Sequence, residues 1–116
     1  MATRKLLYHF NRAPYGTVFY TEGWRAAVGA VAGIDEHEVT LLFQGDGVYY
    51  CLKGAERTEN KGYEQTLQKG GTKYYAVKED LEQRDISASE VANDMTIIPR
   101  ADTWRLYQEA DFNLDW

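Results

Sequence analysis

Short apolar runs alternate along the chain with segments whose apolar residues recur every three or four positions. The most apolar run, residues 38–43, is rich in branched side chains and is nearly continuous. Such a run is typical of a parallel strand covered on both faces, so we expect it in the middle of a sheet. Four further strand-like runs share short length and β-forming residues, and they lie at residues 5–10, 73–77, 95–99 and 112–116. The last one alternates, as an edge strand does.

The segments between these runs favour helices. Apolar residues from Trp24 to Val31 recur at helical spacing, which predicts an amphipathic helix over residues 22–32. The same periodicity and the glycine stop signals predict further helical segments at residues 48–55, 63–68, 80–84 and 102–110. Ser87 and Glu90 have the spacing of a capping box, which marks the start of another helical turn.

Strands that alternate with helices in this way are typical of a three-layer α/β/α sandwich with a mostly parallel five-stranded sheet. A chain of 116 residues is the usual size of one domain, so we expect a single domain over residues 1–116. In such sheets the working surface lies beyond the carboxyl ends of the strands. Two turns qualify, at residues 11–17 and 44–47.

The first turn combines several polar groups with the start of a helix. It contains Asn11, Arg12, Tyr15, Gly16 and Thr17, and Thr17 is placed to cap the helix. The guanidinium, the phenol and the N–H groups at the helix start can together hold an anion or a partner that carries a persulfide. The same residues also suit a plain connection between a strand and a helix.

The second turn contains Gly45, Asp46 and Gly47. Its glycines let backbone approach a ligand closely, and Asp46 supplies one carboxylate. No Lys-Ser/Thr pair follows the glycines and no G-x-G-x-x-G is present, so neither turn is a phosphate-binding loop. This turn, too, can serve as a simple connection.

Charge and composition exclude several classes of function. The formal net charge of -5 opposes direct nucleic-acid binding, and no run of about 18 apolar residues is available to span a membrane. We see no signal peptide and expect a cytoplasmic protein without a cofactor. The two histidines, His9 and His37, have no second likely ligand beside them, so we expect no metal site. His9, inside a strand, is better explained as a histidine satisfied by its neighbours than as a catalytic base.

Cys51 is the single thiol of the chain. It rules out an internal disulfide and is the one candidate for a covalent nucleophile. A reactive thiol needs exposure and a lowered pKa, whereas Cys51 shares a predicted helical stripe with Val48 and Leu52. The pattern therefore favours packing, and a reactive or an interfacial cysteine remains as the alternative.

The first turn reads Ala-Pro-Tyr-Gly-Thr over residues 13–17 and is followed by Glu-Gly at 22–23. The second region reads Leu-Leu-Phe, Asp-Gly-Val and Leu-Lys-Gly at residues 41–43, 46–48 and 52–54. In these segments the chain resembles the DsrE/DsrF/DsrH family of sulfur-relay proteins, which includes the TusB, TusC and TusD subunits, and it is most similar to the DsrF/TusC type. Residues 78–86 resemble the family's Leu-x-x-Arg-Gly-Leu/Ile helix, with Asp85 in place of the glycine.

The resemblance implies a DsrE-like, flavodoxin-like fold and assembly into homo-oligomers or into hetero-oligomers with sibling sulfur-relay proteins. In the sulfur-carrying members a cysteine ends the third strand, just before the Leu-x-x-Arg-Gly helix. The matching residue here is Val77, which has no nucleophile. The resemblance therefore implies a non-catalytic member of a sulfurtransferase family.

Three hypotheses about function follow. The first is a subunit of an intracellular sulfur-relay assembly that lacks the family's persulfide cysteine and uses a pocket at the two turns. The second is an active persulfide carrier, a sulfurtransferase, that uses Cys51. The third is a small-ligand-binding module on the same fold.

Overall fold

The computed structural model describes residues 3–15, 18–33, 36–55 and 61–116. In this part of the chain five strands form one sheet, in the order β4-β3-β2-β1-β5, and every neighbouring pair is parallel. The strands are β1 (Lys5–Phe10), β2 (Glu38–Phe43), β3 (Lys73–Val77), β4 (Thr96–Ile98) and β5 (Phe112–Asp115). The prediction that the most apolar run is the central strand is confirmed, and so is the edge position of the last strand.

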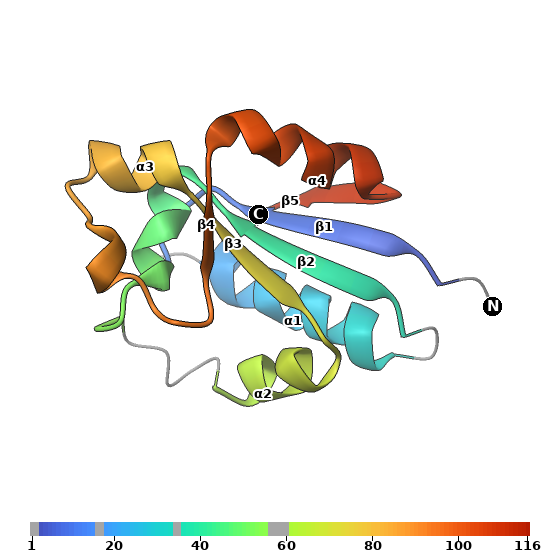
Figure 1. Ribbon diagram of the computed structural model, residues 1–116. Coiled ribbons are helices and arrows are strands. Elements are labelled where there is room, and N and C mark those ends of the chain that lie inside the picture. The colour runs from blue at the N-terminus through green and yellow to red at the C-terminus, as the bar shows by residue number, and fades with distance from the viewer. Residues whose placement is uncertain (1–2, 16–17, 34–35, 56–60) are drawn as a thin grey trace.

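Helices cover both faces of this sheet. They are α1 (Val18–Ala32), η1 (Gly45–Cys51), α2 (Lys61–Lys69), α3 (Lys78–Gln83), η3 (Ala88–Glu90), η4 (Arg100–Asp102) and α4 (Thr103–Glu109), where η marks a 3₁₀ helix. Helices α1 and α2 lie against one face and α4 lies against the other (Figure 1). The predicted three-layer α/β/α sandwich with a parallel sheet is confirmed.

An aromatic cluster fills the layer between the sheet and α1. Trp24 is fully buried, and its ring centroid lies 5.2 Å from that of Tyr50 and 6.1 Å from that of Phe43. Phe10 stacks on Phe43 at 5.4 Å. Rings at these separations interact favourably in addition to the area that they bury. The cluster therefore fixes the ends of β1 and β2 against α1 and η1.

The layer under α4 is much thinner. Its buried residues are Leu7, Leu42 and Val77, one from each of three adjacent strands. Leu106 and Tyr107 of α4 pack against them. Because side chains alternate along a strand, these residues lie on the face of the sheet opposite to the aromatic cluster.

The helix that we predicted over residues 48–55 is wrong in type and in extent. The observed η1 begins at Gly45 and ends at Cys51, after which Leu52 adopts an extended backbone and forms an antiparallel bridge with Val91. Gly45 has a φ of 55°, a left-handed conformation that glycine adopts without strain, and this starts the helix directly after β2. Pairing with the segment around Val91 then ends it early.

Candidate functional site

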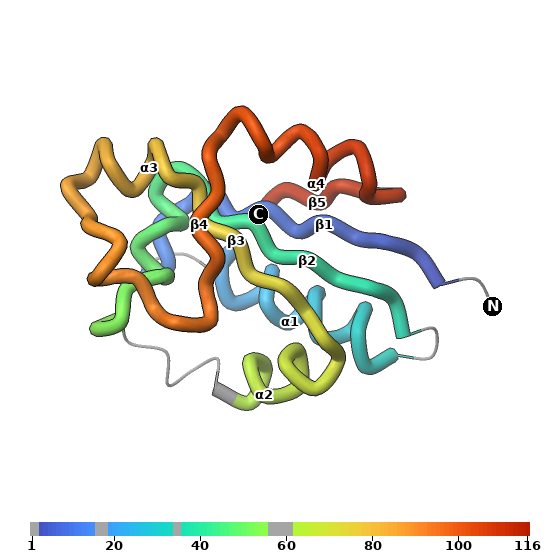
Figure 2. The backbone as a smooth tube through the Cα atoms, in the orientation of Figure 1, coloured from blue at the N-terminus to red at the C-terminus, as the bar shows by residue number. Residues whose placement is uncertain are grey.

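The two turns singled out in the sequence lie against each other at the carboxyl ends of β1 and β2. The backbone N–H of Gln44 donates to the carbonyl of Phe10 at 3.0 Å. A Cβ added to Gly47 would lie 2.2 Å from that same carbonyl oxygen, so only glycine fits there. Figure 2 shows the segments after β1 and β2 side by side at the left-hand end of the molecule.

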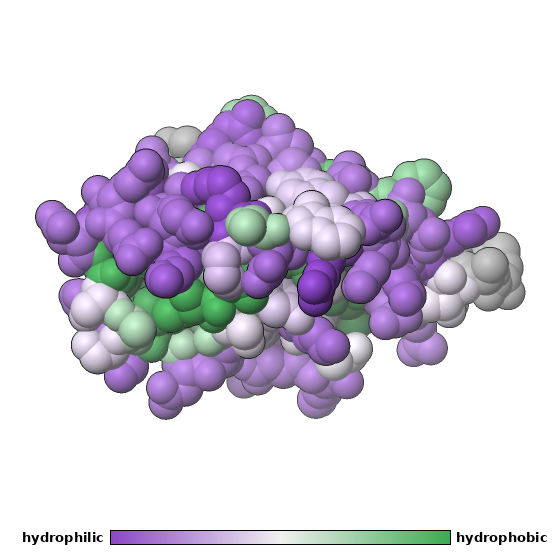
Figure 3. Space-filling view, turned by 45° about the horizontal axis from the view of Figure 1, so that its top comes forward, coloured by the Kyte–Doolittle hydropathy of each residue, from purple (hydrophilic) through white to green (hydrophobic). Residues whose placement is uncertain are grey.

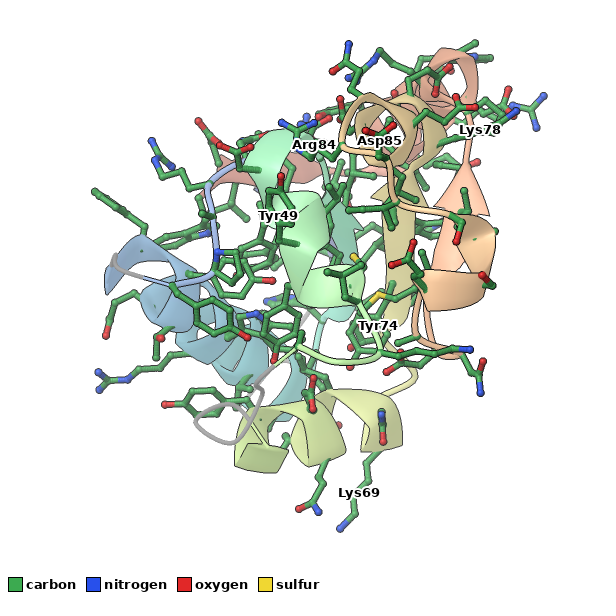
Figure 4. The ribbon with its side chains drawn as sticks, turned by 90° about the vertical axis from the view of Figure 1, so that its left-hand side faces the viewer. Tyr49, Lys69, Tyr74, Lys78, Arg84 and Asp85 are labelled. Carbon is green, nitrogen blue, oxygen red and sulfur yellow. The ribbon has the colours of Figure 1, made fainter. Side chains whose placement is uncertain are left out.

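An ion pair connects the second turn to α3. Arg84 donates from Nη2 and Nε to Oδ1 of Asp46 at 2.8 and 3.2 Å, and from Nη1 to the carbonyl of Asp80 at 3.0 Å. The hydrogen bond to Asp46 is the main cause that raises the pKa of Arg84 above its ordinary value. The guanidinium also lies 5.8 Å from the ring centroid of Tyr49, and Figure 4 shows both side chains at the end of the molecule nearest the viewer. Arg84 thus contacts both Asp46 and Tyr49 of η1.

Asp80 is a buried carboxylate in the middle of this arrangement. Its side chain is 6% exposed. Oδ2 accepts a hydrogen bond from the backbone N–H of Gly45 at 2.8 Å, and Oδ1 pairs with the guanidinium of Arg100. Burying a charge is costly unless it is paired and hydrogen-bonded, and here it is both. Asp80 therefore ties the turn after β2 to the segment after β4.

A second polar cluster lies at the same end of the sheet, on the face that α4 covers. The Nδ1 atom of His9 is 3.5 Å from a carboxylate oxygen of Asp115 and 3.3 Å from the side-chain nitrogen of Asn11. The ring centroid of Tyr107 lies 5.5 Å from that of His9, and its hydroxyl accepts a hydrogen bond from Gln44 at 3.0 Å. Strands β1 and β5, helix α4 and the two turns thus contribute to one cluster.

Burial lowers the pKa of His9 below its ordinary value of 6.5, and Asp115 offsets part of this shift. On acidification His9 binds a proton at a higher pH in the unfolded chain than in the folded one. We therefore expect the free energy of unfolding to fall as the pH decreases from 6.5 to the lower pKa of the folded state. In the variant His9→Gln this part of the pH dependence should vanish. Urea unfolding at several pH values between neutral and mildly acidic measures it. Equal slopes for the two proteins would contradict the shift.

The predicted residues of the first turn lie in different surroundings. Asn11 belongs to the His9 cluster, and the guanidinium of Arg12 lies 4.7 Å from the ring centroid of Phe19. Tyr15 is 54% exposed. Gly16 and Thr17 lie outside the described residues.

In the second turn, the backbone N–H of Gly45 donates to Asp80, Asp46 pairs with Arg84, and Gly47 contacts the end of β1. Ligand binding by these residues stays a prediction.

Two solved structures resemble this architecture over nearly its whole length. The crystal structure of the YchN protein from E. coli matches with a TM-score of 0.81 and 20% sequence identity, covering 98% of this chain and 100% of that one. MTH1491 from Methanobacterium thermoautotrophicum, a protein of unknown function, matches with a TM-score of 0.79 and 10% identity, covering 97% and 99%. Both belong to the DsrE/TusD-like fold. The chain has the DsrE-type fold.

The sequence comparisons add no family assignment to this fold. No family model matches the chain, and no curated protein is significantly similar to it in sequence. Among the described residues no group of three His, Cys, Asp or Glu side chains is arranged to hold a metal ion. No described helix is long and apolar enough to cross a membrane.

In this DsrE-type fold Cys51 and Val77 lie on opposite sides of the sheet. Cys51 is fully buried in the aromatic core between the sheet and α1. Val77 is equally buried, but it packs with Leu7 and Leu42 under α4. Packing was the favoured interpretation of Cys51, and its burial agrees with it. The thiol is not placed to substitute for a group at Val77.

Most of the side chains that surround the two turns carry no signal in the local sequence. No local pattern indicated that Asp80 and Arg100 meet. The contacts of His9 with Asn11 and Asp115, in contrast, agree with its interpretation as a strand histidine satisfied by its neighbours. Tyr107 and Asp115 gave no signal, because their partners are distant in sequence. Arg84 did carry a signal, the Leu-x-x-Arg resemblance, and its helix follows the carboxyl end of β3 directly, where open parallel sheets place their working surface.

Proposed function

We propose that this chain is a non-catalytic, DsrF/TusC-like subunit of an intracellular sulfur-relay assembly. The observation that carries the proposal is the ion pair between Asp46 and Arg84. It joins the two segments on which the sulfur-relay resemblance depends, the Asp-Gly turn and the Leu-x-x-Arg helix. These segments are 38 residues apart in the chain.

The end of that helix supports the same comparison. Asp85 has a φ of 54°, a left-handed conformation that glycine adopts freely and that aspartate tolerates better than most residues. It occupies the position at which the family has glycine. A left-handed backbone at Asp85 is what a glycine at this position would adopt freely, which supports the comparison with the family's motif.

In the proposed assembly this chain does not itself carry sulfur. A persulfide forms on an accessible thiolate, and Cys51, the single thiol of the sequence, is fully buried. The position that carries sulfur in the family holds Val77. Burial of Cys51 is also the reason to prefer this proposal over an active carrier. What the chain contributes is a binding surface at the turns for a sibling protein that bears the persulfide.

Two measurements test the two parts of this proposal. Intact mass after incubation with polysulfide should show no added sulfur atom on the folded protein, whereas the urea-unfolded protein should gain one at Cys51.

Light scattering with a cysteine-bearing DsrE-type protein from the same genome should show a defined complex. The variant Arg84→Ala should weaken that complex, and Arg25→Ala, at an exposed residue of α1, should not.

Either part can fail separately. Sulfur gained by the folded protein and passed to an acceptor would overturn the non-catalytic role. The absence of any complex with cysteine-bearing siblings would overturn the assembly role. A complex that is indifferent to Arg84→Ala would remove the turns from the interface.

A further inference from the structure

A groove of about 820 Å³ lies beside the candidate site, between η1, η3 and the first turn. Its lining is mainly apolar and aromatic and includes Tyr15, Tyr49, Leu52, Lys53, Ala55 and Ser89. Pockets that hold small ligands have this size and this composition, with few polar groups among apolar walls. In Figure 3 the largest group of hydrophobic residues in view lies toward the left-hand end, where Figure 1 shows η1, on a face that is mostly polar.

The groove has a fixed frame, because the backbones of two of its walls are hydrogen-bonded to each other. The N–H of Lys53 donates to the carbonyl of Glu90 at 2.9 Å, and that of Ala92 donates to the carbonyl of Cys51 at 2.8 Å. The bridge between Leu52 and Val91 lies between these two bonds. Because these walls are already joined, ligand binding needs to order less of the backbone, and the entropic cost of binding is smaller.

Two charged side chains in the lining, Lys53 and Glu90, bear on the charge of a ligand. Lys53 is the cation in the lining, and no ion pair joins it to another residue within the ranges that the structure describes. The carboxylate of Glu90, also in the lining, accepts hydrogen bonds from the N–H and hydroxyl of Ser87 at 3.0 and 3.1 Å. These bonds are the main cause that lowers the pKa of Glu90. Glu90 therefore stays ionised and engaged with its own helix cap, whereas Lys53, which has no acidic partner among the described residues, can pair with an acidic ligand.

We propose that this groove binds a planar aromatic anion, a carboxylate or a sulfonate on a ring system. The phenol rings of Tyr15 and Tyr49 come from different segments and offer stacking surfaces, and they are 54% and 39% exposed. Leu52 and Ala55 contact the apolar body of the ligand, and Lys53 pairs with its acidic group. This site is independent of the proposed sulfur-relay role, because it needs neither a partner protein nor a thiol.

The probe for this site is 2-naphthoate, followed by ¹H–¹⁵N NMR titration of the full chain. We expect saturable shifts of the amide signals at residues 53–55 and 89–90. The neutral analogue 2-naphthalenemethanol should bind more weakly. Lys53→Met should reduce the affinity for naphthoate about threefold to fivefold, the size expected for a pair that is partly exposed to water. The control Lys69→Met, at an exposed lysine on α2, should leave the affinity unchanged.

A second pair of variants tests the location without removing any contact. A Cβ at Gly54, in the groove lining, or at Gly62, on α2, would meet no heavy atom within 4 Å. Both glycines thus accept a larger residue. Gly54→Leu should weaken naphthoate binding by occupying part of the groove lining, and Gly62→Leu should not affect it. The proposal is overturned by the absence of saturable shifts at millimolar probe, by shifts centred elsewhere, or by equal affinity for the neutral analogue.

Discussion

Replacing Gly47 by alanine should destabilise the protein by about 3 kcal/mol, at the upper end of the range for overpacking. The added Cβ would lie 2.2 Å from the carbonyl oxygen and 2.9 Å from the carbonyl carbon of Phe10. These are backbone atoms of a buried strand, so no side-chain rotation can relieve the contact. The midpoint of urea unfolding, followed by tryptophan fluorescence, measures the loss.

Two other glycines calibrate this result. Gly45 has a φ of 55° and would place a Cβ 3.2 Å from the carbonyl oxygen of Asn11, so Gly45→Ala should cost about 1–2 kcal/mol for the left-handed conformation. Gly54→Ala meets nothing within 4 Å and should change stability by less than about 0.5 kcal/mol. Equal midpoints for all three variants would mean that the turn after β2 does not pack on the end of β1.

Replacing Asp80 by alanine should cost about 2 kcal/mol, because hydrogen bonds to a charged group are worth about 1.5–3 kcal/mol. The variant leaves the N–H of Gly45 without its carboxylate acceptor and Arg100 without its buried counter-ion. The estimate lies in the lower part of that range because the side chain of Arg100 is half exposed and water can replace its partner. Urea unfolding measures this change as well.

Two further variants separate the contributions at Asp80. Asp80→Asn can still accept the hydrogen bond from Gly45 but loses the ion pair with Arg100, so its cost should lie between zero and that of Asp80→Ala. Glu82→Ala removes an exposed carboxylate from the same helix and should stay within about 0.5 kcal/mol of the unaltered protein. A loss at Glu82 as large as that at Asp80 would show that net charge, and not this network, governs stability.

The arrangement at the turns also explains why some of the site was visible in the sequence. Gly45, Asp46 and Gly47 stood out because glycines directly after an apolar strand signal a special backbone. Arg84 stood out only as part of the Leu-x-x-Arg resemblance, and no local pattern showed that it pairs with Asp46, 38 residues away. Nothing in the local pattern around Asp80 shows that its carboxylate is buried.

For Cys51 and Val77, too, the sequence predicted one property and the tertiary structure showed another. The spacing of Cys51 from other apolar residues was enough to predict that it is buried, although the helix type around it was wrong. Their placement on opposite sides of the sheet depends on the register of three strands and on the path of η1. Only the assembled sheet shows that one cannot replace the other.

The sequence by itself determined the layers of this protein. Its alternation of apolar runs and helical stripes is a local property, set by the periods of strand and helix, and each segment carries it independently. The tertiary structure alone decided which charges meet, as in Asp80 with Arg100 and His9 with Asp115, and where a groove forms beside Tyr49. Those contacts join residues that are far apart in the chain, and no local period records them.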